Sequence, residues 1–149
     1  MSLSSRGRAS ETVRFPTDAG YQSTLLVGVY FRDGAKEMVK SWTEGYLGAH
    51  GQCSDLKVLE VSCVESLVFR WAPLQKVLVQ GLVKNAKQDV EYLASFGNAS
   101  GMMRRLDVSN RMTAYCFLVD CRGNVRWRGS GKATDKELDI IHACVERLK

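Results

Sequence analysis

Five cysteines are the residues of this chain best suited to chemistry, because a thiolate serves both as a nucleophile and as a metal ligand. They are Cys53, Cys63, Cys116, Cys121 and Cys144. Their number is odd and no two are spaced as C-x-x-C, so neither a fully paired disulfide framework nor a dithiol redox motif is present. Only His50 and His142 are available to complete a zinc site, and we therefore expect no metal. Cys63 and Cys116 lie in apolar runs and are interpreted as small core residues.

Other catalytic patterns are equally weak. Glu60 and Glu65 are interpreted as solvated charges at strand edges rather than as a paired acid and base. The run Gly129–Lys132 reads GSGK but lacks the full spacing of a phosphate-binding loop, so it is interpreted as a turn. We predict that the protein is not an enzyme and needs no cofactor. A residual thiol enzyme, with a cysteine–histidine pair assembled in space, stays as an alternative.

Composition and charge fit one ordinary globular domain. The chain has 149 residues, of which 45% are hydrophobic and 25% charged, with a net charge of +5. The longest strongly apolar run, Leu25–Phe31, has the length of a strand, so no membrane span is expected. The basic excess is compatible with RNA or with an acidic partner, although no RNA-binding aromatic signature accompanies it. The basic residues gather loosely at Arg104, Arg105, Arg111, Arg122, Arg126, Arg128 and Lys132.

The first residues differ in composition from the rest. Met1–Ser10 is rich in serine and arginine and has no acidic residue, which is typical of part of a mitochondrial transit segment, of a disordered tail or of an expression remnant. We predict a flexible N-terminal tail over residues 1–14 and a single domain over residues 15–149.

The elements that must position any site alternate between strands and helices. Ser23–Phe31 is predicted to be a buried central strand, and Leu56–Cys63 a second strand. Between them we expect a helix capped by Asp33, followed by a loop over Gly48–Ser54. The face of this helix is made by Met38, Trp42 and Tyr46. A helix is expected within Leu67–Lys84 and a short one over Gly101–Leu106, whereas Asp89–Phe96 is assigned as short helix or irregular structure.

The C-terminal part predicts a hairpin and a closing helix. After a turn at Asn110–Thr113, a strand covers Ala114–Val119, and Arg122–Asn124 turns the chain into a returning strand over Val125–Arg128. The helix Thr134–Leu148 begins with a capping box of Thr134 and Glu137. Its core face comprises Leu138, Ile141, Cys144 or Val145, and Leu148.

The order β-α-β-α-(α)-β-β-α predicts a thioredoxin-like α/β fold, with a central mixed sheet, flanking helices and a C-terminal β-hairpin plus helix. In thioredoxin-like enzymes the reactive cysteine follows the first long strand, at the start of the next helix. Here that place reads FRDGAKEM and holds no cysteine. A cis-proline normally precedes the third core strand, but Met112–Ala114 contains no proline, because the chain's only prolines are Pro16 and Pro73. We therefore predict binding in place of thiol redox chemistry.

The segment from Met103 to the C-terminus resembles the C-terminal signature of the Atp-ten family, assembly factors for the membrane sector of mitochondrial ATP synthase. Ala114 stands where that family tends to have glycine, and Ser130 where cysteine or another small residue is expected. The matching positions are Leu106, Val108, Asn110, Arg111, Thr113, Tyr115, Phe117, Leu118, Val119, Asp120, Gly123, Val125, Arg126, Trp127, Gly131, Ala133 and Thr134.

This resemblance implies a thioredoxin-like, redox-inert protein of the mitochondrial matrix or inner-membrane periphery that chaperones a hydrophobic, newly made subunit. Five residues are predicted to bind the protein partner: Asn110, Arg111, Arg126, Trp127 and Arg128. Each also has a structural interpretation. Asn110 can tie the turn before its strand, and of Arg126 and Trp127 one must face outward because a strand has two faces.

Two binding functions are compatible with these features. The first is an assembly factor or chaperone that binds protein partners of a large mitochondrial complex. The second is a structural subunit, or an assembly factor, of another such complex, for example the mitochondrial ribosome, where ribosomal RNA is a possible contact. Proteins that co-purify in native complexes distinguish the two.

Overall fold

A computed structural model describes residues 3–4, 24–50, 56–65, 73–75, 77, 81 and 90–148. One mixed sheet has the strand order β1-β4-β3-β2-β5-β6. Its strands are β1 (Leu3–Ser4), β2 (Thr24–Tyr30), β3 (Leu56–Val64), β4 (Val90–Phe96), β5 (Tyr115–Val119) and β6 (Val125–Ser130). The helices are η1 (Asp33–Ala35), α1 (Lys36–His50), α3 (Ser100–Leu106) and α4 (Asp135–Leu148).

The central strand β2 confirms the strand predicted over residues 23–31. All seven of its residues are buried, because β2 has neighbours on both edges and helices over both faces. It pairs in parallel with β3 and antiparallel with β5. A Cβ built on Gly28 would lie 2.4 Å from Cγ1 of Val39, so glycine is the residue that lets α1 approach the sheet this closely.

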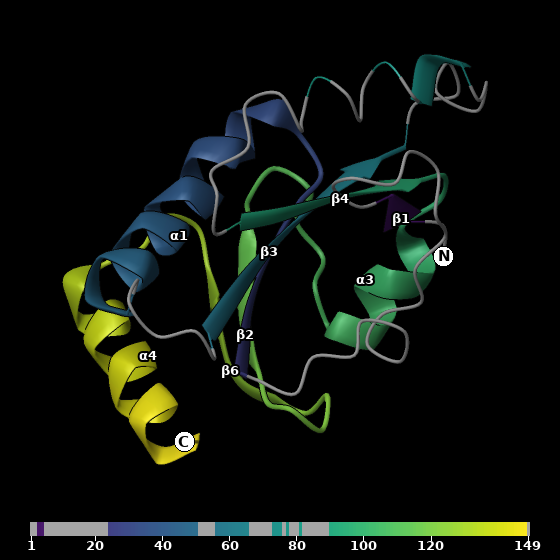
Figure 1. The fold of residues 1–149 in the computed structure, drawn as a ribbon. Helices are drawn as coiled ribbons and strands as arrows, with labels where there is room; N and C mark the ends of the chain where they lie inside the picture. The colour runs from purple at the N-terminus through teal and green to yellow at the C-terminus, as the bar shows by residue number, and fades with distance from the viewer. Residues whose placement is uncertain are drawn as a thin grey trace.

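Helices cover both faces of the sheet (Figure 1). α1 and α4 lie side by side on one face, where Trp42 and Tyr46 pack with Ile141 and Val145, all four without exposed surface. α3 covers the other face and inserts Met103 into a second apolar cluster. These contacts confirm the predicted faces of both long helices. Among the described helices, none is long and apolar enough to cross a membrane.

Two of the predicted boundaries around α1 are wrong. Gly48–His50 belongs to the helix and not to a loop. Leu47 packs against the core just before these residues, and a glycine near a helix end weakens the helix by only about 1 kcal/mol, so the helix continues. Asp33 does not cap the helix either, because η1 has Arg32 at its N-cap position and no side-chain cap hydrogen bond.

The segment Asp89–Phe96 was predicted as short helix or irregular structure, and that assignment is wrong. Val90–Phe96 forms β4, which pairs in parallel with β3 from Val58↔Val90 to Val64↔Phe96. Five of the seven residues of β4 are apolar, and so short an apolar run does not by itself distinguish a strand from part of a helix. Pairing with a neighbour that is distant in sequence decides the structure here, as is common in sheets.

The C-terminal hairpin and helix follow the prediction. β5 pairs antiparallel with β6, and the capping box forms, with Thr134 N donating to Oε2 of Glu137 at 3.1 Å and Glu137 N donating to Oγ1 of Thr134 at 3.4 Å. Within the predicted N-terminal tail, Leu3 and Ser4 form β1 beside β4. The other residues of that tail lie outside the described residues, as do Cys53 and most of Leu67–Lys84.

Candidate partner-binding surface

The end of β2 is where thioredoxin-like enzymes place their reactive thiol. In this protein that place is taken by Arg32, Asp33 and Gly34, which are all exposed. Arg32 has extended backbone geometry (φ −138°, ψ 145°), and the chain then enters η1. Asp33 lies in the first turn of η1, where a negative charge is favourable near the free N–H groups.

The loop before β5 lies at the same end of the sheet, because Val29 near the end of β2 pairs with Tyr115 at the start of β5. Asn110 holds this loop in shape. Its Oδ1 accepts a hydrogen bond from Met112 N at 2.9 Å, and its backbone N–H donates to the hydroxyl of Tyr115 at 3.0 Å. The side-chain tie expected of Asn110 is therefore present, and the loop presents Met112 with 69% of its surface exposed.

Arg111 attaches this loop to two other elements. Its Nε donates to Oε2 of Glu65 at 2.7 Å, and its Nη2 lies 3.4 Å from both Oε1 of Glu65 and Oγ of Ser100. Oε1 of Glu65 also accepts from Ala99 N at 3.2 Å. Hydrogen bonding from Arg111, more than the smaller opposing effect of burial, lowers the pKa of Glu65.

Of the two glutamates predicted to be solvated strand-edge charges, Glu60 is buried, so that interpretation is wrong for it, whereas Glu65 keeps 28% of its side chain exposed and forms an ion pair. Glu65 is held by Arg111 as just described. Glu60 is buried at 5% exposure beneath α1, where its Oε1 accepts a hydrogen bond from the hydroxyl of Thr43 at 3.0 Å. The hydroxyl of Thr43, which is distant in the sequence, accounts for the error at Glu60, since a carboxylate enters a protein interior when donors are there to receive it.

The turn between β5 and β6 is organised by Asp120. Its Oδ1 accepts from the backbone N–H groups of Arg122 and Asn124 at 2.9 and 2.8 Å, and its Oδ2 from Arg126 Nε at 2.7 Å. Burial opposes ionisation of this carboxyl, but hydrogen bonds from Asn124, Arg126 and Arg122 outweigh it and lower the pKa of Asp120 to about 2. An aspartate three residues before Gly123 in the turn was the available signal for this anchor, and the site prediction missed it.

The two faces of β6 carry different side chains, as the alternation of a strand requires. Trp127 points to the α1 and α4 side, where its ring lies 5.2 Å from that of Trp42. Arg128 belongs to the opposite side, because it pairs with Phe117 of the cluster beneath α3, whereas Arg126 lies where the register between β5 and β6 shifts. Arg128 Nη1 lies 3.2 Å from Oδ2 of Asp107, the residue that ends α3, and both side chains of this pair are exposed, at 59% and 88%.

The five predicted binding residues therefore do not form one cluster. Asn110 and Arg111 lie in the loop at the end of the sheet where β2 terminates. Arg126, Trp127 and Arg128 lie along β6, with Arg126 bound to the turn at the opposite end of the hairpin. Strand β6 brings three of the five together, and divides them between its two faces.

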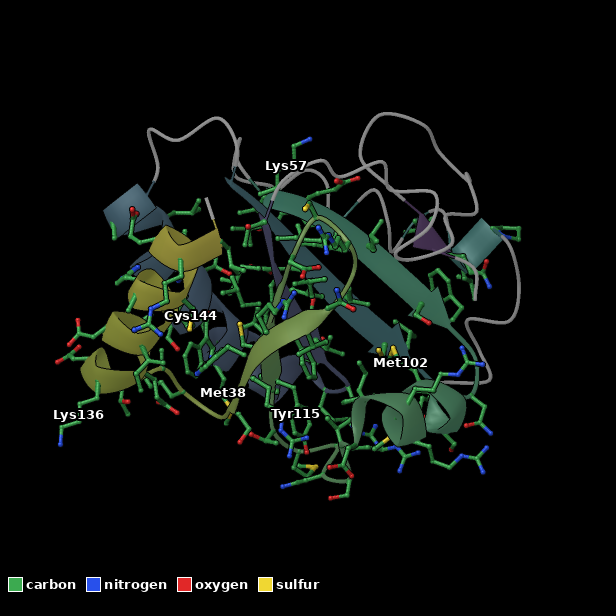
Figure 2. The ribbon with its side chains drawn as sticks, turned by 90° about the horizontal axis from the view of Figure 1, so that it is seen from below. Met38, Lys57, Met102, Tyr115, Lys136 and Cys144 are labelled. Carbon is green, nitrogen blue, oxygen red and sulfur yellow. The ribbon has the colours of Figure 1, made fainter. Side chains whose placement is uncertain are left out.

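The described cysteines, Cys63, Cys116, Cys121 and Cys144, are all free thiols. Burial raises the pKa of Cys63 to about 12, and burial likewise raises the pKa of Cys116 well above its ordinary value. Both thiols therefore stay protonated near neutral pH, as suits core residues. Cys121 is exposed in the turn after β5, and Cys144, which is half-buried, lies on α4 (Figure 2).

A mixed sheet in this order, with helices on both faces and no cysteine where β2 meets the first helix, defines a thioredoxin-like protein without the usual thiol motif. The model of the ATP10 protein family matches residues 17–148. The chain therefore belongs to the ATP10 protein family, and this confirms the resemblance of its C-terminal motif to the signature of that family. Membership of this family implies a role in ATP synthase assembly and a mitochondrial location.

Solved structures of low sequence identity share the fold. The chain is similar to BsSco, a member of the Sco family of cytochrome c oxidase assembly proteins, with a TM-score of 0.63 and 13% identity over 93% of this chain and 86% of that one. Peroxiredoxin Q of Xanthomonas campestris has a TM-score of 0.59 and 16% identity, over 99% of this chain and 90% of that one. A thiol-disulfide isomerase from Corynebacterium glutamicum has a TM-score of 0.54 and 13% identity, over 85% of this chain and 82% of that one. No curated protein matches the chain.

Proposed function

We propose that this protein is a non-enzymatic assembly factor for the membrane sector of mitochondrial ATP synthase, which acts by binding a newly made protein subunit. The observation that carries the proposal is the end of β2. The strand and the helix that hold the reactive thiol in thioredoxin-like enzymes are both present there, but Arg32–Asp33–Gly34 occupies the position of that thiol. We take ATP synthase to be the complex because the chain belongs to the ATP10 protein family. We place the protein in the matrix or at the periphery of the inner membrane.

Binding in place of chemistry is supported by how this end of the sheet is built. Glu65, Arg111 and Ser100 connect the end of β3, the loop before β5 and the start of α3 through hydrogen bonds. A loop fixed in this way holds Met112 outward without the flexibility that weakens binding. We therefore assign Asn110 and Arg111 to positioning a contact surface, and Arg126, Trp127 and Arg128 to a second surface along β6.

Isolation of the tagged protein from mitochondria tests this function. We expect transient recovery with newly made subunits of the ATP synthase membrane sector, detected by pulse labelling. Stoichiometric recovery with ribosomal proteins and ribosomal RNA would instead establish the alternative, a structural or assembly role in the mitochondrial ribosome. Loss of that RNA at raised salt would indicate phosphate contacts.

Replacement of all five cysteines by serine tests the absence of thiol chemistry. The variant is expected to fold and to restore ATP synthase assembly in cells that lack the protein. Valine in place of serine at Cys63 and Cys116 is the matched control, because both thiols are buried and a hydroxyl there is costly. A folded variant of either kind that fails to restore assembly would contradict a non-enzymatic role.

A further inference from the structure

Strand β6 ends the sheet, and its outer edge is open. The strand order places β5 on its inner side, and no described element pairs with its outer side. Figure 2 looks onto this edge, with α4 on one side and α3 on the other. An edge strand of six residues offers a row of main-chain donors and acceptors, which natural proteins either protect or use.

The hydrogen bonds of the hairpin determine which main-chain groups face outward. Gly131 N donates to Ala114 O at 2.9 Å. Bonded and non-bonded pairs alternate along an antiparallel ladder, so the register makes Cys116↔Gly129 the next bonded pair. Arg128 and Ser130 then belong to non-bonded pairs, and their N–H and C=O groups point to the open edge. An added strand pairs with residues of this kind, which alternate along the edge and direct their main-chain N–H and C=O groups outward.

The side chains beside this edge define what an added strand must carry. Toward α3 the side chain is that of Arg128, and toward α4 the residues are Trp127 and Gly129. An added strand also alternates between the two sides. Its side chains toward α3 would meet the guanidinium group of Arg128, and those toward α4 would meet the indole of Trp127. Acidic and apolar residues in alternation satisfy both sides.

The present partner of Arg128 does not prevent this pairing. Asp107 and Arg128 are both exposed, and an exposed ion pair contributes only about 0–1 kcal/mol. A carboxylate on an added strand can therefore replace Asp107 as the partner of Arg128, or share Arg128 with Asp107. Arg104 and Arg105 lie in the last turn of α3, which Asp107 caps, and add positive charge near that residue.

The distribution of charge along the chain also favours an acidic partner at this edge. Residues 99–132, which include α3, β5 and β6, contain seven cationic and two acidic side chains, a net charge of +5. This equals the net charge of the whole chain, because the fourteen cationic and fourteen acidic residues elsewhere cancel. The open edge thus lies in the segment that carries all of the basic excess, and electrostatic attraction favours an acidic partner there.

We propose that β6 binds an extended segment of a partner protein as an additional strand, and that acidic residues alternate with apolar ones in this segment. This rests on the proposed function in taking the partner to be a protein. A second copy of the chain is the wrong occupant. Two β6 edges paired around a two-fold axis would bring two segments of the same positive charge side by side, with Arg128 opposite its own copy when the axis passes through it, and like charges facing across a ladder are destabilising.

Direct titration with a synthetic peptide tests the proposal. The probe is a blocked nine-residue peptide of alternating glutamate and valine, and its control has lysine in place of glutamate. We expect the acidic peptide to bind about tenfold or more tightly than the basic one, because the cross-strand charge pair with Arg128 changes from attractive to repulsive in a segment of net positive charge. Hydrogen exchange should slow at the amides of Arg128 and Ser130, and not at those of Trp127 and Gly129, which β5 already protects.

Two variants separate charge from main-chain pairing. Arg128→Glu should weaken binding of the acidic peptide about tenfold. Lys136→Glu makes the same charge change at an exposed position of α4, remote from the edge (Figure 2), and should leave binding unchanged. Ser130→Pro removes an outward N–H while keeping every arginine, and the preceding Gly129 tolerates proline best. It too should weaken binding, with the melting temperature checked for each variant.

Several results would overturn the proposal. Equal affinity for the two peptides, or binding that neither Arg128→Glu nor Ser130→Pro weakens, would exclude this edge as the site. A dimer of the free protein that Ser130→Pro dissociates would make a second copy the occupant. If the peptide fails to bind while the tagged protein still recovers ATP synthase subunits, the edge is wrong and the proposed function stands. If those subunits are also lost from the native isolation, the proposed function fails independently.

Discussion

Arg111 and Glu65 lie 46 positions apart in the sequence, and Nε of Arg111 donates to Oε2 of Glu65 at 2.7 Å. The contact joins the end of β3 to the loop that precedes β5. That loop lies where thioredoxin-like enzymes carry a cis-proline, and here an ion pair and the side chain of Asn110 fix its shape. Fixing the loop with side chains makes its geometry sensitive to single substitutions.

Arg111→Lys is expected to lower the free energy of unfolding by about 1 kcal/mol, because lysine keeps the charge but cannot reproduce the fork that contacts Glu65 and Ser100. Urea denaturation of the variant and of wild type measures the difference. Arg105→Lys is the matched control, since Arg105 is exposed on α3 and makes no ion pair with any described residue, so its effect should stay within about 0.5 kcal/mol. Equal effects of the two changes would contradict the role given to Arg111.

The stabilising effect of Glu65 should depend on pH. Its pKa is lower in the folded protein than in the unfolded chain, where a glutamate titrates near about 4.3. Its contribution is therefore complete above about pH 4.3 and is lost as the pH falls through the folded pKa. The difference in unfolding free energy between wild type and Glu65→Gln should be largest at pH 7 and shrink below about pH 4. A difference that grows on acidification would contradict the hydrogen-bonded carboxylate.

These contacts also show where sequence reasoning succeeded and where it failed. The central strand, the hairpin and the capped α4 are local patterns, readable from apolar runs and from the pair Thr134 and Glu137. The location of β4 and the partners of Glu60 and Glu65 depend on segments that are distant in the chain. No local pattern marks such pairings. The same holds for the open edge, which exists only once the strand order is known.

Asp120 should titrate far below an ordinary aspartate. Its pKa of about 2 lies under the unfolded value of about 3.9, so its stabilising effect is complete above about pH 3.9 and is lost as the pH falls toward 2. A carboxyl-detected NMR titration measures the midpoint directly. Asp120→Asn should lower the melting temperature at pH 7 and match wild type below about pH 2, whereas a midpoint near 4 would show that the turn does not hold the carboxylate.

The contact between Trp42 and Trp127 should be measurable as a coupling energy. Trp42 has no exposed surface, and its Nε1 donates to Gly131 O at 2.8 Å, so Trp42→Phe removes both packing and a hydrogen bond. We expect a loss of about 1–3 kcal/mol in the free energy of unfolding, and a smaller loss for Trp127→Phe, which is half-buried. A double-mutant cycle to alanine should give a coupling of about 0.5–1.5 kcal/mol, as for other aromatic pairs. Additive effects would show that the rings do not interact.

Gly129 should be intolerant of a side chain even though it lies on an edge strand. A Cβ built there would lie 2.4 Å from Cη2 of Trp127 and 2.9 Å from Cη2 of Trp42, so both rings would have to shift. Gly129→Ala is therefore expected to lower the free energy of unfolding by about 1–3 kcal/mol. Gly48→Ala is the matched control, because nothing lies within 4 Å of a Cβ at that exposed helical position, and it should stabilise the protein by about 0.5–1 kcal/mol. A neutral Gly129→Ala would mean that the rings retreat without loss, and the face of β6 toward α4 would then be free to repack around a bound strand.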